Sequence, residues 1–447
     1  MTLASCYLVK GIFKENGVMM KSVRIVFWCL ALFFIGYLVF FQKKETESTW
    51  AWILVLWNFP LVGILLYFLT GQEFPKEKRK NAKNKIGELT EDNNVRILLS
   101  GEEKFAALLQ DIREAKKEIL LQYYILKDDF LFQTIEELLL KKALQGVEVK
   151  ILYDALGSRK VKKRRWESLK KKGIKVKVFR SPFLRRIVPG FNYRNHRKIV
   201  IIDKYIGYLG GYNLGKEYLG LDARFGFWRD THLRIVGSAV QSLREVFLKD
   251  WGEMREGNQI SKGQGGCGVQ IVTSSPGTPA PHIRNVYLRL IMAAKEKIWI
   301  QTPYFIPDQP VLTALKMALL SGKEVKIMIP CKPDHAFVYW ATLFYAGELL
   351  EAGAGVYIYE NGFLHTKGLI MDEDIYCYGT ANMDIRSFRL NYEINALVYG
   401  VDEVKKMVEA YKRDLADCTE MKLEEYALRS GRIRIKEQLF RLLSPLL

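Results

Sequence analysis

The 447-residue sequence has few cysteines and no arrangement of them that is typical of a metal site or a disulfide framework. The six cysteines are Cys6, Cys29, Cys267, Cys331, Cys377 and Cys418. No two form a Cys-x-x-Cys pair, and none has a histidine beside it at metal-ligand spacing. Free cysteines are usually buried packing residues. We therefore expect reduced thiols, no bound metal, and a body that faces the cytosol.

A complete nucleotide-binding motif is also absent. Residues 210–216 (GGYNLGK) begin like a phosphate-binding loop, but Glu217 stands where Ser or Thr would hold magnesium. Residues 263–268 (GQGGCG) fit G-x-G-x-x-G, yet they precede a strand instead of joining a strand to a helix. The sequence therefore predicts no cofactor and no requirement for ATP.

Acidic residues are outnumbered, with 49 Asp and Glu against 68 Lys and Arg, which gives a formal net charge of +19. An excess this large favours a polyanionic partner, either nucleic acid or an anionic membrane surface. Charge alone does not choose between the two.

Apolar residues are concentrated near the N-terminus. Residues 25–41 are continuously apolar or aromatic, and residues 50–69 form a second run. Both are close to the roughly 17 to 20 residues that span a bilayer core, and no signal-peptide cleavage site follows the first run. We predict a retained two-helix transmembrane hairpin within residues 1–75. A buried hairpin of a soluble protein is the alternative, but it fits poorly with so few polar residues.

Basic residues flank the predicted hairpin on its outer sides, before residue 25 and after residue 75. Positive residues mark the cytoplasmic side of membrane proteins. We therefore predict a multi-pass protein of the cell (inner) membrane with both termini and the catalytic body in the cytoplasm.

After a basic linker at residues 76–94, the sequence repeats itself. AKKEILLQ at residues 115–122 matches AKEKIWIQ at 294–301, and EVKIL at 148–152 matches EVKIM at 324–328. Short apolar strands alternate with helical stretches in both copies, which predicts an α/β fold with helices flanking mixed sheets. We expect a first lobe at 95–256, a polar hinge at 257–266, and a second lobe at 267–447 that ends in an amphipathic segment.

Both lobes contain the pattern H-x-K-x4-D, followed by an asparagine 17 residues after the histidine. The residues are His196, Lys198, Asp203 and Asn213 in the first lobe, and His365, Lys367, Asp372 and Asn382 in the second. Histidine and lysine two residues apart on a strand point to the same face. If the lobes pack about a pseudo-two-fold axis, both His-Lys pairs meet in one cleft.

Such a cleft contains what phosphodiester exchange requires, without a metal. One imidazole attacks phosphorus, and the other protonates the leaving oxygen and later takes a proton from the incoming alcohol. The two lysines place positive charge on the phosphate, and the two asparagine amides donate hydrogen bonds to it. The motif aspartates, Asp203 and Asp372, join the candidate catalytic set, although closing a turn at a strand end explains them equally well.

These paired motifs resemble those of the phospholipase D superfamily, and together with the apolar hairpin the sequence resembles the bacterial cardiolipin synthases along nearly its whole length. The resemblance implies transfer of a phosphatidyl group from one phosphatidylglycerol to another, with release of glycerol through a phosphohistidine. It also implies that His196 is the nucleophile and His365 the acid and base. A carboxylate downstream of each motif would lie against the imidazole of that motif, and Asp230 and Glu393 match these positions. The sequence itself does not distinguish the roles of the two histidines.

The placement of basic residues favours lipid as the partner. Residues 159–177 are densely basic, and residues 180–194 mix arginines with large apolar side chains, as in interfacial loops on anionic headgroups. A solvated basic helix is the alternative. We expect phosphatidylglycerol and other anionic phospholipids of the inner leaflet as partners, and no nucleic acid.

Two other activities stay open, a hydrolytic phospholipase D and a phosphatidyltransferase with a different alcohol acceptor. A catalytically idle membrane scaffold is disfavoured by the intact motifs. The sequence does not indicate the oligomeric state.

Overall fold

The computed structural model describes residue 26 and residues 28–40, 46–67, 87–179, 193–253, 263–276 and 282–444. The chain divides into a small N-terminal unit within residues 1–75 and a large unit that contains every described residue from Gly87 onward. Most of the predicted linker and hinge, and residues 180–192 of the predicted interfacial loop, lie outside the described residues.

The N-terminal unit contains a helical stretch at residues 28–40, α2 (Thr46–Asn58) and α3 (Pro60–Leu66). The prediction of one continuous helix over residues 50–69 is wrong, because the chain breaks at Phe59, with Pro60 as the first residue of α3. Proline lacks an N–H and fits the first turn of a helix but not its interior. Among the described residues, no helix is both long and apolar enough to cross a membrane, so the predicted transmembrane hairpin is not supported.

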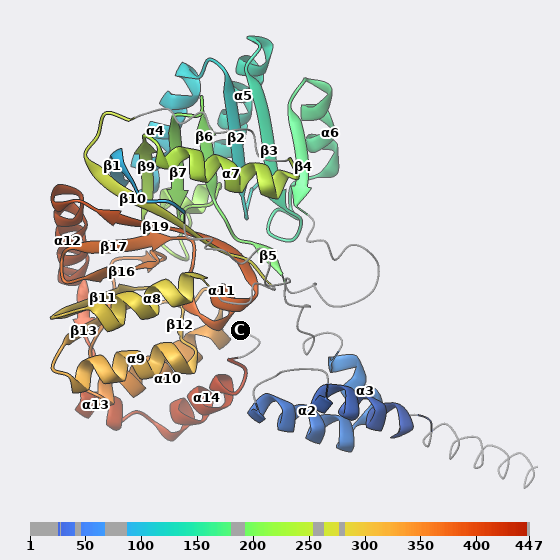
Figure 1. The fold of residues 1–447 in the computed structure, drawn as a ribbon, viewed down its shortest axis with the longest axis vertical. Coiled ribbons are helices and arrows are strands. Elements are labelled where there is room, and N and C mark those ends of the chain that lie inside the picture. Colours follow the sequence, from blue (N-terminus) through green and yellow to red (C-terminus); the bar gives the residue numbers. More distant parts are fainter. Residues whose placement is uncertain are drawn as a thin grey trace, which may run out of the picture. The chain divides into compact units, whose positions relative to one another are not determined.

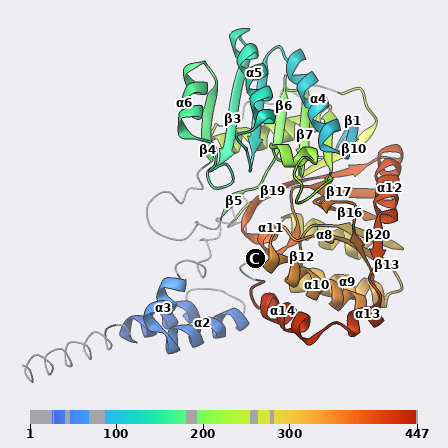
Figure 2. The same cartoon turned by 180° about the vertical axis from the view of Figure 1, so that it is seen from behind.

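The large unit is built on one mixed sheet made of two matching halves (Figures 1 and 2). The first half runs in the order β1 (Thr90–Leu98), β9 (His232–Val236), β7 (Ile206–Gly210), β6 (Ile199–Ile202), β2 (Glu118–Tyr123), β3 (Glu148–Asp154) and β4 (Lys175–Phe179). The second runs β10 (Cys267–Ser274), β19 (Asn391–Tyr399), β17 (Ile375–Gly379), β16 (Gly368–Met371), β11 (Lys297–Gln301), β13 (Glu324–Pro330) and β14 (Gly355–Tyr359), with β20 (Cys418–Glu420) at its edge. The predicted α/β class is confirmed.

The two halves join through β1 and β10, which pair antiparallel. Since β1 and β10 hold the same place in their halves, this is the arrangement that a pseudo-two-fold axis between the lobes would give. In the first half β2, β3 and β4 are parallel to one another, as are β11, β13 and β14 in the second, and the other neighbouring strands, including β20 with β14, pair antiparallel.

Helices cover both faces of the sheet. On the outer faces lie α4 (Gly101–Glu114), α5 (Phe130–Leu144) and α6 (Lys163–Lys171) of the first lobe, and α8 (His282–Ala293), α9 (Gln309–Leu320) and α10 (Ala336–Glu351) of the second. The equivalent helices α5 and α9 begin alike, since Asp129 and Asp308 accept hydrogen bonds from backbone N–H groups of the first turn. Such caps satisfy donors that have no partner within the helix.

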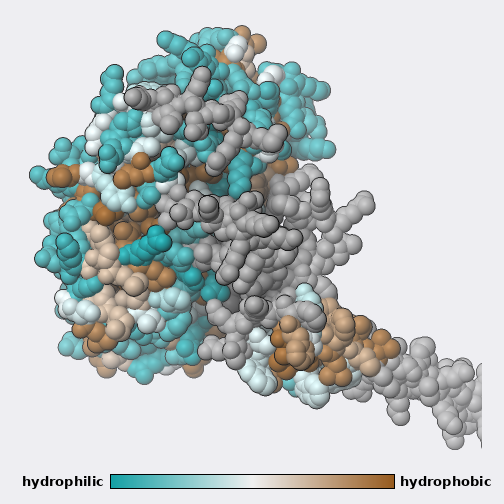
Figure 3. Space-filling view, in the orientation of Figure 1, coloured by the Kyte–Doolittle hydropathy of each residue, from teal (hydrophilic) through white to brown (hydrophobic). Residues whose placement is uncertain are grey.

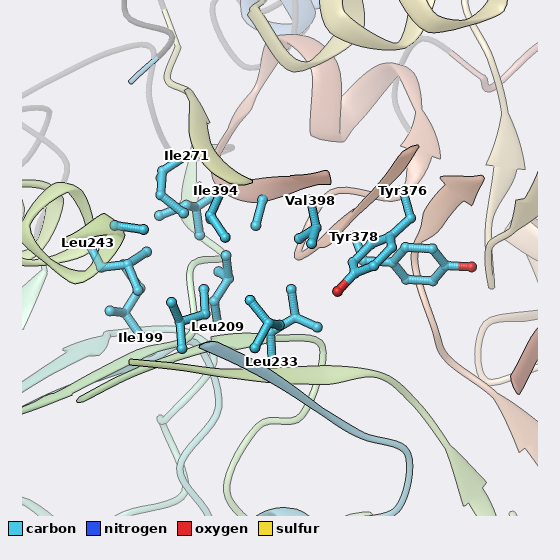
Figure 4. Packing of buried hydrophobic residues seen from close by; sticks show 14 of the residues in the cluster. Ile199, Leu209, Leu233, Leu243, Ile271, Tyr376, Tyr378, Ile394 and Val398 are labelled. Carbon is cyan, nitrogen blue, oxygen red and sulfur yellow. The ribbon is translucent and has the colours of Figure 1, made fainter. Parts of the chain in front are cut away.

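The inner faces of both half-sheets share a single core with α7 (Ala239–Trp251) and α12 (Val401–Ala416). Figure 4 shows Leu209, Leu233 and Leu243 of the first lobe near Ile394 and Val398 of the second. Because each lobe buries apolar surface against the other, the lobes stabilise each other's position.

The motif aspartates close equivalent turns, after β6 and after β16. The Asp203 carboxylate accepts hydrogen bonds from the backbone N–H groups of residues 116–118, and the Asp372 carboxylate from those of residues 295–297. Both residues adopt left-handed backbone conformations, with φ of 53° and 51°. Each carboxylate thus ties a turn to the start of the neighbouring strand, β2 or β11.

We expect Asp372→Ala to lower the free energy of unfolding by about 2 to 3 kcal/mol, because three charge-assisted hydrogen bonds are lost. Burial alone would raise the pKa of Asp372, but the backbone N–H donors lower it below its ordinary value of 3.8. A lowered carboxyl pKa stabilises the fold above that pH and loses this contribution as pH falls. The variant should therefore lose less stability on acidification than the parent protein.

Urea unfolding followed by circular dichroism at pH 7 and near pH 3 measures both effects. Asp374→Ala, an exposed aspartate in the same turn, is the matched control. Equal unfolding free energies for the two variants would contradict the role assigned to the Asp372 carboxylate.

Candidate active site

The two motif histidines are fixed by short parallel strand pairs that cross between the lobes. β5 (Arg194–Asn195) of the first lobe pairs with the start of β19, and β15 (Phe363–Leu364) of the second pairs with β8 (Trp228–Arg229). Directly after these pairs, the His196 N–H donates to the Tyr392 carbonyl at 3.0 Å, and the His365 N–H donates to the Arg229 carbonyl at 2.7 Å. Each histidine is therefore positioned by backbone from the opposite lobe.

The carboxylates are exchanged between the lobes as well. Glu393 of the second lobe contacts Nδ1 of His196 with both oxygens at 3.0 Å. Asp230 of the first lobe contacts Nδ1 of His365 at 2.6 Å. The expectation that each carboxylate lies against the imidazole of its own motif is therefore wrong, because the crossed strand pairs carry Asp230 and Glu393 to the opposite lobe's histidine. With Nδ1 occupied, Nε2 is left for chemistry.

Both carboxylates are fully buried, and further hydrogen bonds hold them. Thr380 donates its hydroxyl to Glu393 at 2.6 Å, and the Thr231 N–H donates to Asp230 at 2.8 Å. At the place equivalent to Thr380 stands Gly211, where a Cβ would lie 2.0 Å from an Asp230 oxygen. A residue without a Cβ is needed here because the Asp230 carboxylate approaches the backbone closely. The sequence analysis considered Gly211 only as part of a possible phosphate-binding loop and did not predict this role.

Lys198 and Lys367 are buried beside the imidazoles. The Lys198 ammonium donates to the His196 carbonyl at 2.7 Å, and that of Lys367 donates to the His365 carbonyl and lies 3.9 Å from Asp230. Burial lowers the pKa of Lys198 to about 7 and that of Lys367 to about 8, although Glu393 and Asp230 oppose the shift. Both amines therefore titrate close to neutral pH.

The pKa values of both imidazoles are lowered, first of all by burial. Glu393 opposes this effect on His196, whereas Lys198 and Lys367 add to it. Burial and then Lys367 lower the pKa of His365 to about 4, with Asp230 opposing. Since the charge of each lysine acts on the other lobe's histidine as well, the structure brings the four predicted side chains together in one cluster.

The other predicted residues lie around or away from this cluster. The Asn213 amide donates to the Tyr218 hydroxyl at 3.0 Å, and the Asn382 amide to Asp384 at 3.2 Å, so each uses a donor within its own lobe. Asp203 and Asp372 lie at the far ends of β6 and β16, bound to backbone N–H groups. Their placement gives no support to the catalytic role expected for them.

Residues that were not predicted also contact the histidines. The Tyr124 ring lies 5.1 Å from the His196 ring, and the Trp228 and Phe363 rings lie 5.0 and 5.8 Å from that of His365. Phe363 could have been found from the sequence, because it lies two residues before His365 on the same strand face. No local pattern marks Trp228, which reaches the histidine from the other lobe.

Within the described part of the chain, no group of three or more His, Cys, Asp and Glu side chains could hold a metal ion. Five cysteines are free thiols, as predicted: Cys29, Cys267, Cys331, Cys377 and Cys418. Cys6 lies outside the described residues.

Comparison with known sequences finds relatives over nearly the whole chain. A family described as "Cardiolipin synthase, PLD-like domain" matches residues 108–251 and 287–415, and one described as "Phospholipase_D-nuclease N-terminal" matches residues 26–72. The major cardiolipin synthase ClsA of Bacillus subtilis (strain 168) is 43% identical, with 94% of this chain and 98% of that protein covered. The cardiolipin synthase of Oceanobacillus iheyensis is also 43% identical, with 92% and 96% covered.

Solved structures share the fold at low sequence identity. The phosphatidylserine synthase of Haemophilus influenzae Rd KW20 has a TM-score of 0.60 at 16% identity and covers 79% of this chain and 95% of its own. The polyphosphate kinase of Porphyromonas gingivalis has a TM-score of 0.53 at 14% identity, covering 78% and 52%. These likenesses concern the fold alone, whereas the sequence relatives identify the family: the chain belongs to the bacterial cardiolipin synthases of the phospholipase D superfamily.

Proposed function

We propose that this protein is a phosphatidyltransferase that converts two phosphatidylglycerol molecules into cardiolipin and glycerol. The observation that carries the proposal is the paired arrangement of two imidazoles, each held at Nδ1 by a buried carboxylate of the opposite lobe, beside two buried lysines. Such a site can break one phosphodiester and make another without external energy, because the bonds broken and formed are of the same kind.

In the first half of the reaction, Nε2 of one imidazole attacks phosphorus and a P–N bond forms. The P–O bond to the headgroup glycerol breaks, and the glycerol oxygen takes a proton from the other imidazole. In the second half, a free hydroxyl of another phosphatidylglycerol gives its proton to that imidazole. Its oxygen displaces the histidine nitrogen from phosphorus, which regenerates both residues.

The lysines and carboxylates support these steps electrostatically. Lys198 and Lys367 stabilise the negative charge that gathers on the non-bridging phosphate oxygens. Glu393 and Asp230 stabilise whichever imidazole becomes positively charged and hold both rings in one tautomer and orientation. Asp203 and Asp372 support the fold rather than the chemistry.

Burial of the site favours transfer to an alcohol over hydrolysis. The side chains of His196 and His365 are only 13% and 9% exposed, and Lys198 is fully buried. Limited access for water protects a phosphohistidine until a second substrate arrives. A hydrolytic phospholipase D would use the same residues with water as the acceptor.

We further propose that the enzyme works on the inner leaflet of the cell membrane. The N-terminal unit exposes large apolar side chains, among them Phe33, Phe40, Phe59 and Leu65, each more than half exposed. Figure 3 shows hydrophobic residues gathered on this unit. Exposed apolar surface of this kind suits contact with lipid.

Incubating purified protein with phosphatidylglycerol alone, without ATP or added metal, should give cardiolipin and glycerol in equal amounts. His196→Ala and His365→Ala should each abolish both products, because each half of the reaction needs both imidazoles. Lipid mass spectrometry and an enzymatic glycerol assay measure the two products. Phosphatidic acid and glycerol without cardiolipin would identify a hydrolase and exclude the proposed acceptor.

Glu393→Gln should lower kcat by about 100-fold or more, as expected when general acid–base catalysis is impaired. The Glu393 carboxylate raises the pKa of His196 against the effect of burial. Without it that pKa falls further, so the limb of the pH–rate profile that belongs to His196 should move to lower pH. Cardiolipin synthesis measured across pH tests this.

Asp230→Asn should shift the limb that belongs to His365 in the same direction, and Glu409→Gln, an exposed carboxylate on α12, should change neither limb. A Glu393→Gln enzyme with the parental pH profile would show that this carboxylate does not tune His196.

The KM for phosphatidylglycerol should rise about tenfold between about pH 7 and pH 9, because Lys367, with a pKa of about 8, loses its proton in this range. Lys198, with a pKa of about 7, should add to the rise. Each lysine is a charged ammonium below its pKa and a neutral amine above it, so the affinity of the site for phosphate falls as pH rises. Lys367→Arg should remove the part of this rise that Lys367 causes, because arginine stays charged. A KM independent of pH in the parent enzyme would exclude a required ammonium of this pKa.

A further inference from the structure

The C-terminal helix α14 (Gly431–Arg441) packs against α10 on the side of the second lobe that faces away from the first (Figures 1 and 2). The Phe440 ring lies 4.8 Å from the ring of Phe337 on α10. The buried and half-buried residues of α14 and of the turn after it recur at helical spacing: Ile433, Glu437, Phe440 and Ser444. These residues define the inward face of the helix.

The opposite face of α14 is apolar and exposed. Ile435, Leu439 and Leu442 are 61%, 56% and 67% exposed. They follow one another at i, i+4 and i+7, the spacing at which side chains share one face of a helix. At 3.6 residues per turn, this face points roughly opposite to the inward residues. We call Ile435, Leu439 and Leu442 the outer stripe.

The charges around the outer stripe are all positive. The one acidic residue of α14, Glu437, is buried and paired with Arg429 at 2.8 Å. At helical spacing, two exposed basic residues border the stripe on each side, Arg432 and Lys436 on one and Arg434 and Arg441 on the other. The outward surface of the helix is therefore apolar along its middle and cationic along both edges.

A core helix needs only one apolar face, and α14 already packs with its inward face. A second apolar stripe bordered by basic residues is typical of helices that lie in the surface of an anionic bilayer. An interface between two copies of this chain through the outer stripes would instead bring like charges together. The charge pattern therefore favours anionic lipid over a second copy as the partner.

Direct contacts connect α14 to the active site. Phe337, which Phe440 contacts, lies at the start of α10, and two carbonyls just before α10 accept hydrogen bonds from Arg224 of the first lobe at 3.2 and 3.0 Å. Next to Arg224, the Phe225 ring lies 5.1 Å from the ring of Phe363. The helix is therefore linked through α10 to the aromatic residues of the active site.

We propose that α14 is a membrane-docking helix, which inserts the outer stripe into the headgroup region of a bilayer and places its exposed basic residues on the phosphates of anionic phospholipids. This inference goes beyond the proposed function, which assigns contact with lipid to the N-terminal unit, and it rests on that function only for the nature of the lipid. Lysine and arginine suit this position because their long stems cover apolar surface while their charged ends reach the phosphates.

Photo-crosslinking tests this contact in the full-length protein. Leu439→p-benzoylphenylalanine is combined with His196→Ala, so that the lipid composition stays constant, and is illuminated on vesicles of phosphatidylglycerol and phosphatidylcholine. Mass spectrometry of the digested protein measures lipid adducts. The yield at residue 439 should exceed that of Leu144→p-benzoylphenylalanine by about tenfold or more, because only residue 439 belongs to an interfacial stripe.

Leu144 is a matched control, because it is an exposed leucine of the first lobe with two lysines just before it. Phe40→p-benzoylphenylalanine reports the N-terminal unit. Adducts at residue 40 with no excess at residue 439 over residue 144 would overturn the docking role of α14 and leave the membrane contact of the N-terminal unit in place. Crosslinks from residue 439 to a second copy of the chain would also overturn it. The test does not depend on the proposed reaction, since the protein used is inactive.

The role of charge is tested at the same labelled position. Arg432→Gln together with Lys436→Gln should lower the yield at residue 439 about fivefold or more, as expected when two basic residues are lost near an anionic surface. Lys405→Gln with Lys406→Gln removes the same charge from exposed positions of α12 and should leave the yield unchanged. Equal losses in the two double variants, or equal yields on vesicles of phosphatidylcholine alone, would overturn the recognition of anionic lipid by α14.

Discussion

Each imidazole of this enzyme depends on a carboxylate that belongs to the other lobe. Glu393 and Asp230 are fully buried, and a buried charge is stable only when partners compensate it. Here the partners are an imidazole, a hydrogen-bond donor and a lysine in each case. Neither lobe alone could form such a set, so the catalytic geometry exists only while the lobes are packed together.

Other buried contacts across the lobe boundary hold this arrangement. Arg197, between the histidine and lysine of the first motif, donates to the carbonyls of Ser274 and Glu393 in the second lobe and pairs with Asp250 at 2.7 Å. Arg229 of the first lobe pairs with Asp414 of the second at 2.6 Å. Together with the shared apolar core, these contacts fix the strands from which the catalytic side chains extend. Removing one member of such a buried pair costs much more than the pair contributes, because an uncompensated charge remains.

The charges of the site residues are nearly balanced, with two lysines against two carboxylates. A bound phosphodiester adds negative charge, which raises the proton affinity of every nearby base. Lysines with pKa values of about 7 and 8 are then held in their charged form, and one imidazole can take up a proton more easily. In the proposed reaction, substrate binding would therefore help to protonate the imidazole that acts as the acid. Much of this electrostatic behaviour follows from burial, which the sequence alone does not show.

The sequence was sufficient to predict the duplicated α/β architecture and the meeting of the two His-Lys pairs, because strand alternation and repeat spacing are local patterns. It was insufficient for the carboxylates, since Asp230 and Glu393 each follow the motif of their own lobe and no local pattern reveals that strands cross. Pro60 is a helix-breaking residue within the apolar run at residues 50–69, and the prediction of one continuous helix did not take it into account. The positive φ of Asp203 and Asp372 was not predicted. Their position at the end of a strand indicated only that each could close a turn.

Duplication gives two equivalent histidines, and an ideal pair could exchange roles from one turnover to the next. The surroundings of the two histidines are nevertheless different, because the neighbouring strand positions carry Arg194 and Asn391 beside His196 and Phe363 and Trp228 beside His365. The residues that make the surroundings of the two histidines differ therefore lie outside the repeated motif, whereas the histidines and lysines that the lobes share lie within it.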